Sequence, residues 1–182
     1  MTSLWTASMV GGLIEKFGMR EAALTVAGAA TATILGALAY EHLGGYEPCE
    51  LCLRQRWAYY AGIPAALLSF VLAHSRPGLA AGLLAFVGVA FIVNAGLGVH
   101  HAGVEWGWWA GPSGCSGGVQ VSGDAGALAE SLSNAAPVRC DEPAFRFLGL
   151  SFAGYNVLIS AALAGLAAIG LRGYLAERVA TA

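Results

Sequence analysis

Residues 79–99 read LAAGLLAFVGVAFIVNAGLGV, and this uncharged stretch decides the class of fold. A helix needs about 20 apolar residues to cross about 30 Å of hydrocarbon. Residues 22–40, 57–74 and 147–171 are also predominantly apolar, so this chain of 182 residues retains too little polar sequence to surround a soluble core. The sequence therefore predicts an all-α membrane protein. The expected architecture is a four-helix transmembrane bundle with a long outer loop between the third and fourth spans.

The composition supports a membrane location. Hydrophobic residues make up 57% of the chain and charged residues only 11%, and the mean hydropathy is +0.65. A soluble domain normally carries about 25% charged residues, which it needs to cover its surface. The net charge of -2 leaves no basic stripe for phosphates, which argues against nucleic acid as a partner.

The four spans define the expected domain organisation. A membrane domain over residues 22–171 has outer loops at 41–56 and 100–146, between an N-terminal segment 1–21 and a tail 172–182. The N-terminal segment shows helical spacing of its apolar residues, which predicts an interfacial helix; a disordered tail is the alternative. Five basic residues lie in the terminal segments and the short second loop, at Lys16, Arg20, Arg76, Arg172 and Arg178. Four others, Arg54, Arg56, Arg139 and Arg146, are spread over the much longer first and third loops, so the density of basic residues, more than their number, decides the orientation. By the positive-inside rule, both termini are expected in the cytoplasm and both loops outside.

The cysteines are the most informative residues of the outer loops. All four of them, Cys49, Cys52, Cys115 and Cys140, fall in these loops and none in a span. Small apolar fillers would be spread through the spans as well. Cysteines outside the bacterial inner membrane face an oxidising compartment, where disulfides persist. The distribution therefore indicates a redox set.

Cys49 and Cys52 form a Cys-x-x-Cys pair just before the second span. If a helix begins here, its N-terminus favours a thiolate at Cys49, and Cys52 lies one turn further on the same face. Arg56 follows at i+4 from Cys52. Arg56 is either a functional cation beside the pair or a membrane anchor, and the sequence favours the cation.

Cys115 and Cys140 are widely spaced in the long polar loop. They could form a plain structural disulfide or the mobile half of a thiol–disulfide relay. Four cysteines with His100 and His101 could also bind zinc. Structural zinc sites usually take two closely spaced pairs of ligands, so no metal is expected.

Several segments together resemble one known family. PCELCLRQR at residues 48–56 is similar to a signature of the disulfide bond formation protein B (DsbB) family. HAGVE at 101–105, GPSGC at 111–115 and FLGLS at 147–151 resemble the ends of its second outer loop, in family order. Gln55 departs from members that carry glutamate at this position.

The resemblance implies a protein-dithiol:quinone oxidoreductase of the bacterial inner membrane, with its cysteine loops in the periplasm. It would reoxidise a DsbA-like thiol oxidoreductase and pass electrons to ubiquinone or menaquinone. Cys115 would form the mixed disulfide with DsbA, and Cys140 would be its loop partner. Cys49 would accept the exchange from the loop, and Cys52 would be the thiolate that contacts the quinone.

The resemblance also implies quinone-binding residues. Arg56 matches an arginine associated with the quinone, and His101 matches a histidine near its ring, although His100 is adjacent. Six aromatic residues could flank a flat ring or form an ordinary aromatic belt. They are Trp57, Tyr59, Tyr60, Trp106, Trp108 and Trp109.

Two other functions compete with this one. A thiol–quinone enzyme of the vitamin K epoxide reductase type also has four helices and four such cysteines. Its loop pair precedes the Cys-x-x-Cys in the chain, whereas Cys49 and Cys52 come first here. A non-enzymatic tetraspan scaffold with structural disulfides is the second alternative, and it would have no need of Arg56.

Overall fold

The computed structural model describes residues 18–112 and 139–180. In these residues it contains four helices and one short hairpin: α2 (Met19–His42), α3 (Glu50–Leu72), α4 (Pro77–Glu105), β1 (Arg146–Phe147), β2 (Leu150–Ser151) and α6 (Phe152–Ala180). The predicted interfacial helix falls mainly on residues 1–17, and Cys115 falls on 113–138. Both lie outside the described residues.

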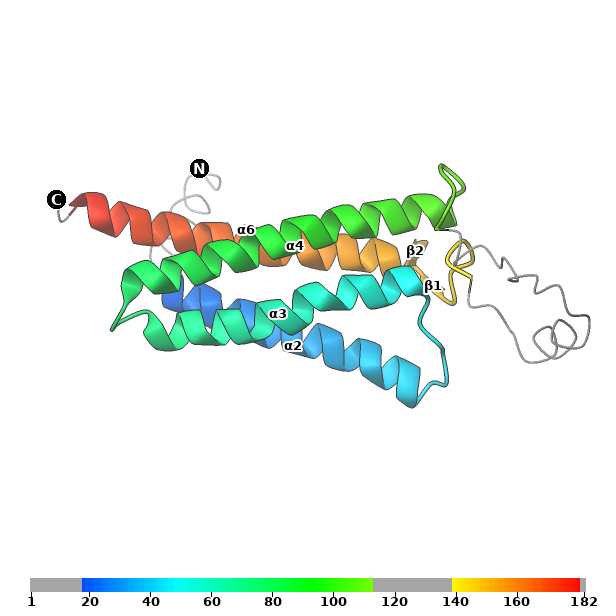
Figure 1. The fold of residues 1–182 in the computed structure, drawn as a ribbon, viewed down its shortest axis with the longest axis horizontal. Coiled ribbons are helices and arrows are strands. Elements are labelled where there is room, and N and C mark those ends of the chain that lie inside the picture. The colour runs from blue at the N-terminus through cyan, green and yellow to red at the C-terminus, as the bar shows by residue number, and fades with distance from the viewer. Residues whose placement is uncertain (1–17, 113–138, 181–182) are drawn as a thin grey trace, which may run out of the picture.

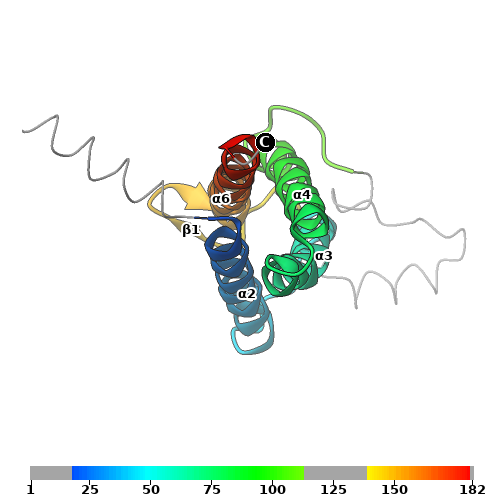
Figure 2. The same cartoon turned by 90° about the vertical axis from the view of Figure 1, so that its left-hand side faces the viewer.

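The helices form a bundle in which each packs against two neighbours. The contacts run from α2 to α3, from α3 to α4, from α4 to α6 and from α6 back to α2, and the view along the bundle shows this ring (Figure 2). The first residues of α2, the turn between α3 and α4, and the end of α6 lie at one end of the bundle. The connection from α2 to α3 and the hairpin β1–β2 lie at the other end (Figure 1).

The bundle belongs to a multi-pass membrane protein. Three of the described helices, α2, α4 and α6, are long and apolar enough to cross a membrane. Their outward faces carry large apolar side chains, among them Leu35, Ile92 and Leu158, which are 56–63% exposed. Helix α3 is 23 residues long, but it does not meet the same criterion because its first two turns carry polar residues such as Arg54, Gln55 and Arg56.

The middle of the bundle is packed with apolar side chains. Phe91 of α4 is fully buried, and its ring meets that of Tyr59 edge-on, with centroids 5.2 Å apart. A Cβ placed on Gly62 would come within 3.1 Å of the Phe91 ring. This glycine therefore allows α3 and α4 to approach closely around the aromatic ring.

The helices differ from the predicted spans at several ends. Helix α4 continues to Glu105, past the predicted end at residue 99, and α6 continues to Ala180, past the predicted end at residue 171. The second helix begins at Glu50, ahead of the predicted start at residue 57, because Cys49 caps it. The fourth helix begins at Phe152, after the predicted start at residue 147. A hairpin occupies the intervening residues, and at its turn Leu148 and Gly149 have φ of 49° and 82°. Positive φ at two successive residues is typical of a tight two-residue turn and incompatible with a helix.

Candidate functional site

The cysteine pair lies where α3 begins. Cys49 is the N-cap residue, with extended backbone (φ -70°, ψ 166°). Its Sγ accepts a hydrogen bond from the Cys52 N–H at 3.4 Å. The two Sγ atoms are 3.1 Å apart, and both cysteines are free thiols. The pair is thus in its reduced form, with the sulfurs positioned to close a disulfide.

The environment of Cys49 favours a thiolate. The hydrogen bond with Cys52 and the contact with His101 lower the pKa of Cys49 to about 4, against the opposing effect of burial. Cys49 immediately precedes α3, so the partial positive charge of the unpaired N–H groups in the first helical turn also stabilises its thiolate. The hydrogen bond to Cys49 and burial raise the pKa of Cys52. In this reduced pair the thiolate is therefore favoured at Cys49, whereas the resemblance implies a thiolate at Cys52.

His101 comes from the last turns of α4 and is buried against the pair. Its Nε2 lies 3.5 Å from Cys49 Sγ and 3.7 Å from Glu105 Oε1. The neighbouring His100 instead faces outward and stacks on Trp109, with the ring centroids 5.8 Å apart. The structure therefore brings His101, and not His100, to the cysteines.

A chain of polar side chains leads from His101 into the bundle. Gln55 of α3 places its Nε2 2.9 Å from His101 Nδ1, and its Oε1 accepts from Asn156 Nδ2 of α6 at 2.5 Å. The Asn156 Oδ1 accepts from the Tyr59 hydroxyl at 2.7 Å and from Asn94 Nδ2 at 3.2 Å. Three helices are thus connected by side-chain hydrogen bonds in largely apolar surroundings.

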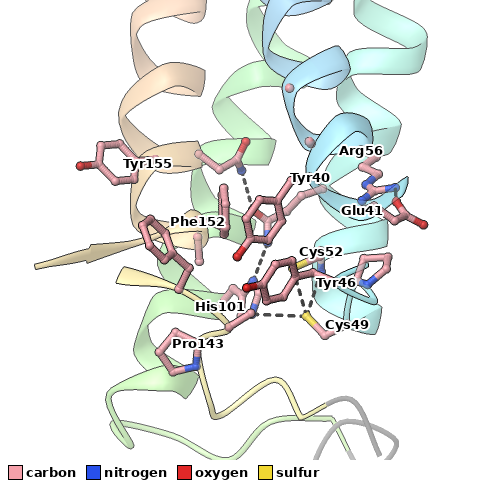
Figure 3. A pocket seen from close by; sticks show the side chains of 18 of the residues that line it. Tyr40, Glu41, Tyr46, Cys49, Cys52, Arg56, His101, Pro143, Phe152 and Tyr155 are labelled. Carbon is pink, nitrogen blue, oxygen red and sulfur yellow. Dashed lines mark hydrogen bonds and ion pairs between the residues drawn. The ribbon is translucent and has the colours of Figure 1, made fainter. Parts of the chain in front are cut away.

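A cavity of about 500 Å³ opens beside the pair. Figure 3 shows Cys49, Cys52, Arg56 and His101 around it, together with aromatic side chains from α2, α6 and the loops. The aromatic residues that line the cavity are Tyr40 of α2, Tyr59 of α3, Phe152 and Tyr155 of α6, and Tyr46 and Phe145 outside the helices. The Tyr40 and Tyr46 rings stack at 4.3 Å with an interplanar angle of 13°. The cavity therefore offers flat apolar walls next to two sulfurs and a cation.

The arginines near the pair have different surroundings. Arg56 is only 12% exposed, and its Nη1 pairs with Glu41 Oε2 of α2 at 2.5 Å. Arg54 is 56% exposed and pairs with Glu50 on its own helix. Arg56 therefore lines the cavity as a paired cation that connects α3 to α2, whereas Arg54 lies on the outer surface.

Cys140 is buried near the Cys49–Cys52 pair. It is 1% exposed and shares one cluster with Cys49, Leu51 and Val104, against which Cys52 packs. Cys140 is disulfide-bonded. The structure thus places one cysteine of the long loop beside the cysteines of α3; Cys115 lies outside the described residues.

Three soft donor atoms are clustered at the site. The sulfurs of Cys49 and Cys52 and a ring nitrogen of His101 lie within 4.8 Å of one another, which is close enough for one metal ion. A histidine nitrogen binds metal only through a lone pair, so the third donor depends on where the His101 ring proton resides. The expectation of no metal stays a prediction.

The sequence pattern identified some members of this site and missed others. Of the six aromatic residues singled out, only Tyr59 lines the cavity; the tryptophans lie elsewhere on the described surface. Tyr40 and Asn156 carried no motif. The available signal was weak: Asn94, Asn156 and Ser160 are polar residues within otherwise apolar spans, and such residues usually face a bundle interior.

The bundle and the pair define a multi-pass membrane protein with a dithiol at one end and a cavity beside it. The chain belongs to the disulfide bond formation protein DsbB family, whose sequence model matches residues 19–170. It is accordingly a membrane oxidoreductase of disulfide bond formation. No curated protein and no solved structure matches the chain significantly.

Proposed function

We propose that the protein reoxidises a DsbA-like periplasmic dithiol protein and passes the electrons to a membrane quinone. The observation that carries the proposal is the reduced Cys49–Cys52 pair, which lines an aromatic cavity and packs against Cys140. Such a site has a neighbour for thiol exchange on one side and space for a flat acceptor on the other.

The packing of Cys140 with Cys49 supports thiol–disulfide exchange between the long loop and the Cys49–Cys52 pair. Once the partner protein has reduced the loop disulfide, a Cys140 thiolate attacks Cys49 Sγ of an oxidised helix pair. The bond from Cys140 to Cys49 forms, the Cys49–Cys52 bond breaks, and the electron pair leaves on Cys52. A Cys115 thiolate then attacks Cys140 Sγ, which restores the loop disulfide, breaks the Cys140–Cys49 bond and leaves Cys49 and Cys52 as a dithiol. Because Cys49 and Cys140 are both buried in this cluster, the attack needs little rearrangement of α3.

The cavity and its residues fit a quinone. The cavity volume of about 500 Å³ lies in the range of about 300–1,000 Å³ that small-molecule sites occupy. Tyr40 and Phe152 provide apolar ring faces, and Arg56 provides N–H donors for a carbonyl oxygen. A quinone bound here would supply an acceptor for two electrons and two protons as the dithiol becomes a disulfide.

Energetics favour a quinone as the acceptor. DsbA has a reduction potential of about -120 mV, so ordinary thiol pools cannot reoxidise it. The acceptor therefore needs a higher potential and access from the membrane. Ubiquinone and menaquinone both satisfy these requirements.

We also propose that α3 is a fourth span and that the site end faces the periplasm of a bacterial inner membrane. Beyond its polar first turns, α3 exposes Leu68 and Val71 on its outer face. Its polar start would lie at the membrane surface. The proposed membrane domain covers residues 22–171, with the segments before and after it in the cytoplasm.

Quinone reduction by the purified protein tests the function. We expect it to reduce a soluble ubiquinone analogue when supplied with a reduced DsbA-like protein, and Cys140→Ser to stop the reaction. Ser69→Ala is a matched control, because Ser69 donates to the Ala80 carbonyl at 2.8 Å at the other end of the bundle. Turnover that persists at the wild-type rate in Cys140→Ser would contradict the relay.

A further inference from the structure

The side-chain amide of Gln55 has a fixed orientation. Its Nε2 lies 3.2 Å from the Leu51 carbonyl oxygen, and a carbonyl oxygen only accepts hydrogen bonds. The end of the amide near Leu51 must therefore be the NH₂ group. The same nitrogen is 2.9 Å from His101 Nδ1, so Gln55 has a hydrogen for each of these acceptors.

Asn156 holds the other end of this amide. The Asn156 Oδ1 accepts hydrogen bonds from the Tyr59 hydroxyl and from Asn94 Nδ2. The NH₂ group of Asn156 is therefore the end that donates to Gln55 Oε1. Gln55 is 6% exposed, and Asn94 is 1% exposed. In this buried setting an inverted amide would place oxygen against oxygen and leave hydrogens unpaired.

We propose that Gln55 is a positioning residue that keeps the ring proton of His101 on Nε2, from which it is donated to Cys49. Since Gln55 donates to Nδ1, that nitrogen carries the lone pair. The groups facing Nε2 agree, because Cys49 Sγ at 3.5 Å and Glu105 Oε1 at 3.7 Å are both acceptors.

The arrangement has two consequences for the pair. A thiolate at Cys49 receives an N–H donor from α4 in addition to the hydrogen bond with Cys52. A protonated Nε2 also cannot bind a metal ion, although it lies 3.5 Å from Cys49 Sγ. Other titratable or charged groups around Cys49 among the described residues include the adjacent Glu50, Glu47 and Arg56 in the same cavity, and, beyond His101, Glu105 with Arg146. The Cys140 disulfide shares its cluster.

The ring proton can be located directly by ¹⁵N NMR of the reduced protein with labelled histidine. The chain has four histidines, and the His101→Gln spectrum assigns the His101 signals by difference. We expect a protonated, pyrrole-type shift at Nε2 and a pyridine-type shift at Nδ1. A protonated Nδ1 in the wild-type protein would overturn the proposal, and this measurement needs no variant to retain activity.

Gln55→Glu tests the role of the amide. A carboxylate cannot donate to Nδ1 and instead accepts from it, so we expect the Nδ1 signal to move to a protonated shift. An unchanged Nδ1 shift in this variant would also overturn the proposal. The inference rests on the proposed function only for its importance to the reaction. A failed turnover assay would therefore leave the NMR result intact, and the converse also holds.

Two isosteric variants test the donation to Cys49. The amide nitrogen of His101→Gln can occupy the place of Nε2, whereas that of His101→Asn can reach only the place of Nδ1. We expect His101→Asn to raise the pH midpoint of Cys49 alkylation by about one to two pH units, the equivalent of one hydrogen bond to a charged group. His101→Gln should stay near the wild-type midpoint. Equal midpoints in the two variants would show that Nε2 donates nothing to Cys49.

Discussion

Cys49 and Cys52 lie one helical turn apart but are chemically different. Cys49 caps α3 and contacts His101, which stabilises its thiolate, whereas Cys52 hydrogen-bonds to Cys49 from within the helix. The stabilisation that the thiolate gives the reduced, folded protein is complete above the ordinary thiol pKa. It is lost as the pH falls through about 4.

The hydrogen bond with Cys52 is the largest cause of the low Cys49 pKa, and its loss should be measurable. We expect Cys52→Ala to raise the pH midpoint of Cys49 alkylation by about one to two pH units. Cys52→Ser retains a hydroxyl donor and should shift the midpoint less. Iodoacetamide modification followed by mass spectrometry identifies which sulfur reacts. Identical midpoints for alanine and serine would exclude Cys52 as the donor.

Arg56 is one of two arginines that line the cavity, and its role can be separated from its ion pair with Glu41. We expect Arg56→Ala to raise the apparent quinone KM severalfold, since N–H donors for a carbonyl oxygen are lost. Glu41→Gln removes the charge of its partner and retains Arg56, so the KM should rise less. Steady-state quinone reduction measures both. An unchanged KM in Arg56→Ala would return this residue to the role of membrane anchor.

The sequence could indicate the residues that carry a local motif. Cys49, Cys52 and Arg56 follow one another at helical spacing, so one short segment was enough to group them. Asn156 and Tyr40 come from helices far away in the chain, and only packing brings them to the same cavity. The sequence likewise could not tell which of His100 and His101 faces the cysteines. That choice depends on how α4 is rotated about its axis in the bundle, which residue spacing does not determine.

At the scale of helices, polar side chains connect α3 to α6 across the bundle, although these two helices are not packed neighbours. The hydroxyl of Tyr59 donates to Asn156 at 2.7 Å, while its ring packs on Phe91. Hydropathy predicted the apolar stretches well because lipid imposes their length. It could not predict the starts of α3 and α6, which depend on the Cys49 cap and on the turn at Leu148.

Tyr59→Phe tests this connection between helices. The ring contacts remain and one buried hydrogen bond is lost, so we expect the free energy of unfolding to fall by about 0.5–1.5 kcal/mol. Tyr60→Phe is the matched control, because Tyr60 is 46% exposed and its loss of a hydroxyl should be nearly neutral. Thermal unfolding in detergent compares the two. Equal melting temperatures would mean that Tyr59 contributes no net hydrogen bond.

At the scale of the whole molecule, the two ends of the bundle differ in how their arginines are engaged. At the site end, Arg54, Arg56 and Arg139 are paired with carboxylates. At the other end, Arg20 lies over the Phe70 ring, 4.5 Å from its centroid. The positive-inside rule counts basic residues whether or not they are paired, so these contacts do not orient the chain. The proposed periplasmic site end rests on the denser basic residues of the opposite end.

Labelling of intact cells tests the orientation. We expect a membrane-impermeant thiol reagent, added after reduction, to label a chain that retains only Cys115. A cysteine-free chain carrying Ser75→Cys should stay unlabelled until the cells are permeabilised, because Ser75 is exposed in the turn at the opposite end. The reverse pattern would place the cysteine loops in the cytoplasm and contradict the proposed topology.

The most direct test of the central claim is a single turnover by the Cys49–Cys52 pair alone. A chain with Cys115→Ser and Cys140→Ser is reduced, freed of reductant and mixed anaerobically with a ubiquinone analogue. We expect about one quinol per protein, with two thiols lost as the Cys49–Cys52 disulfide forms. The same chain with Cys52→Ser should yield none. Quinol formation without loss of thiols, or an equal yield from the Cys52→Ser chain, would contradict the account.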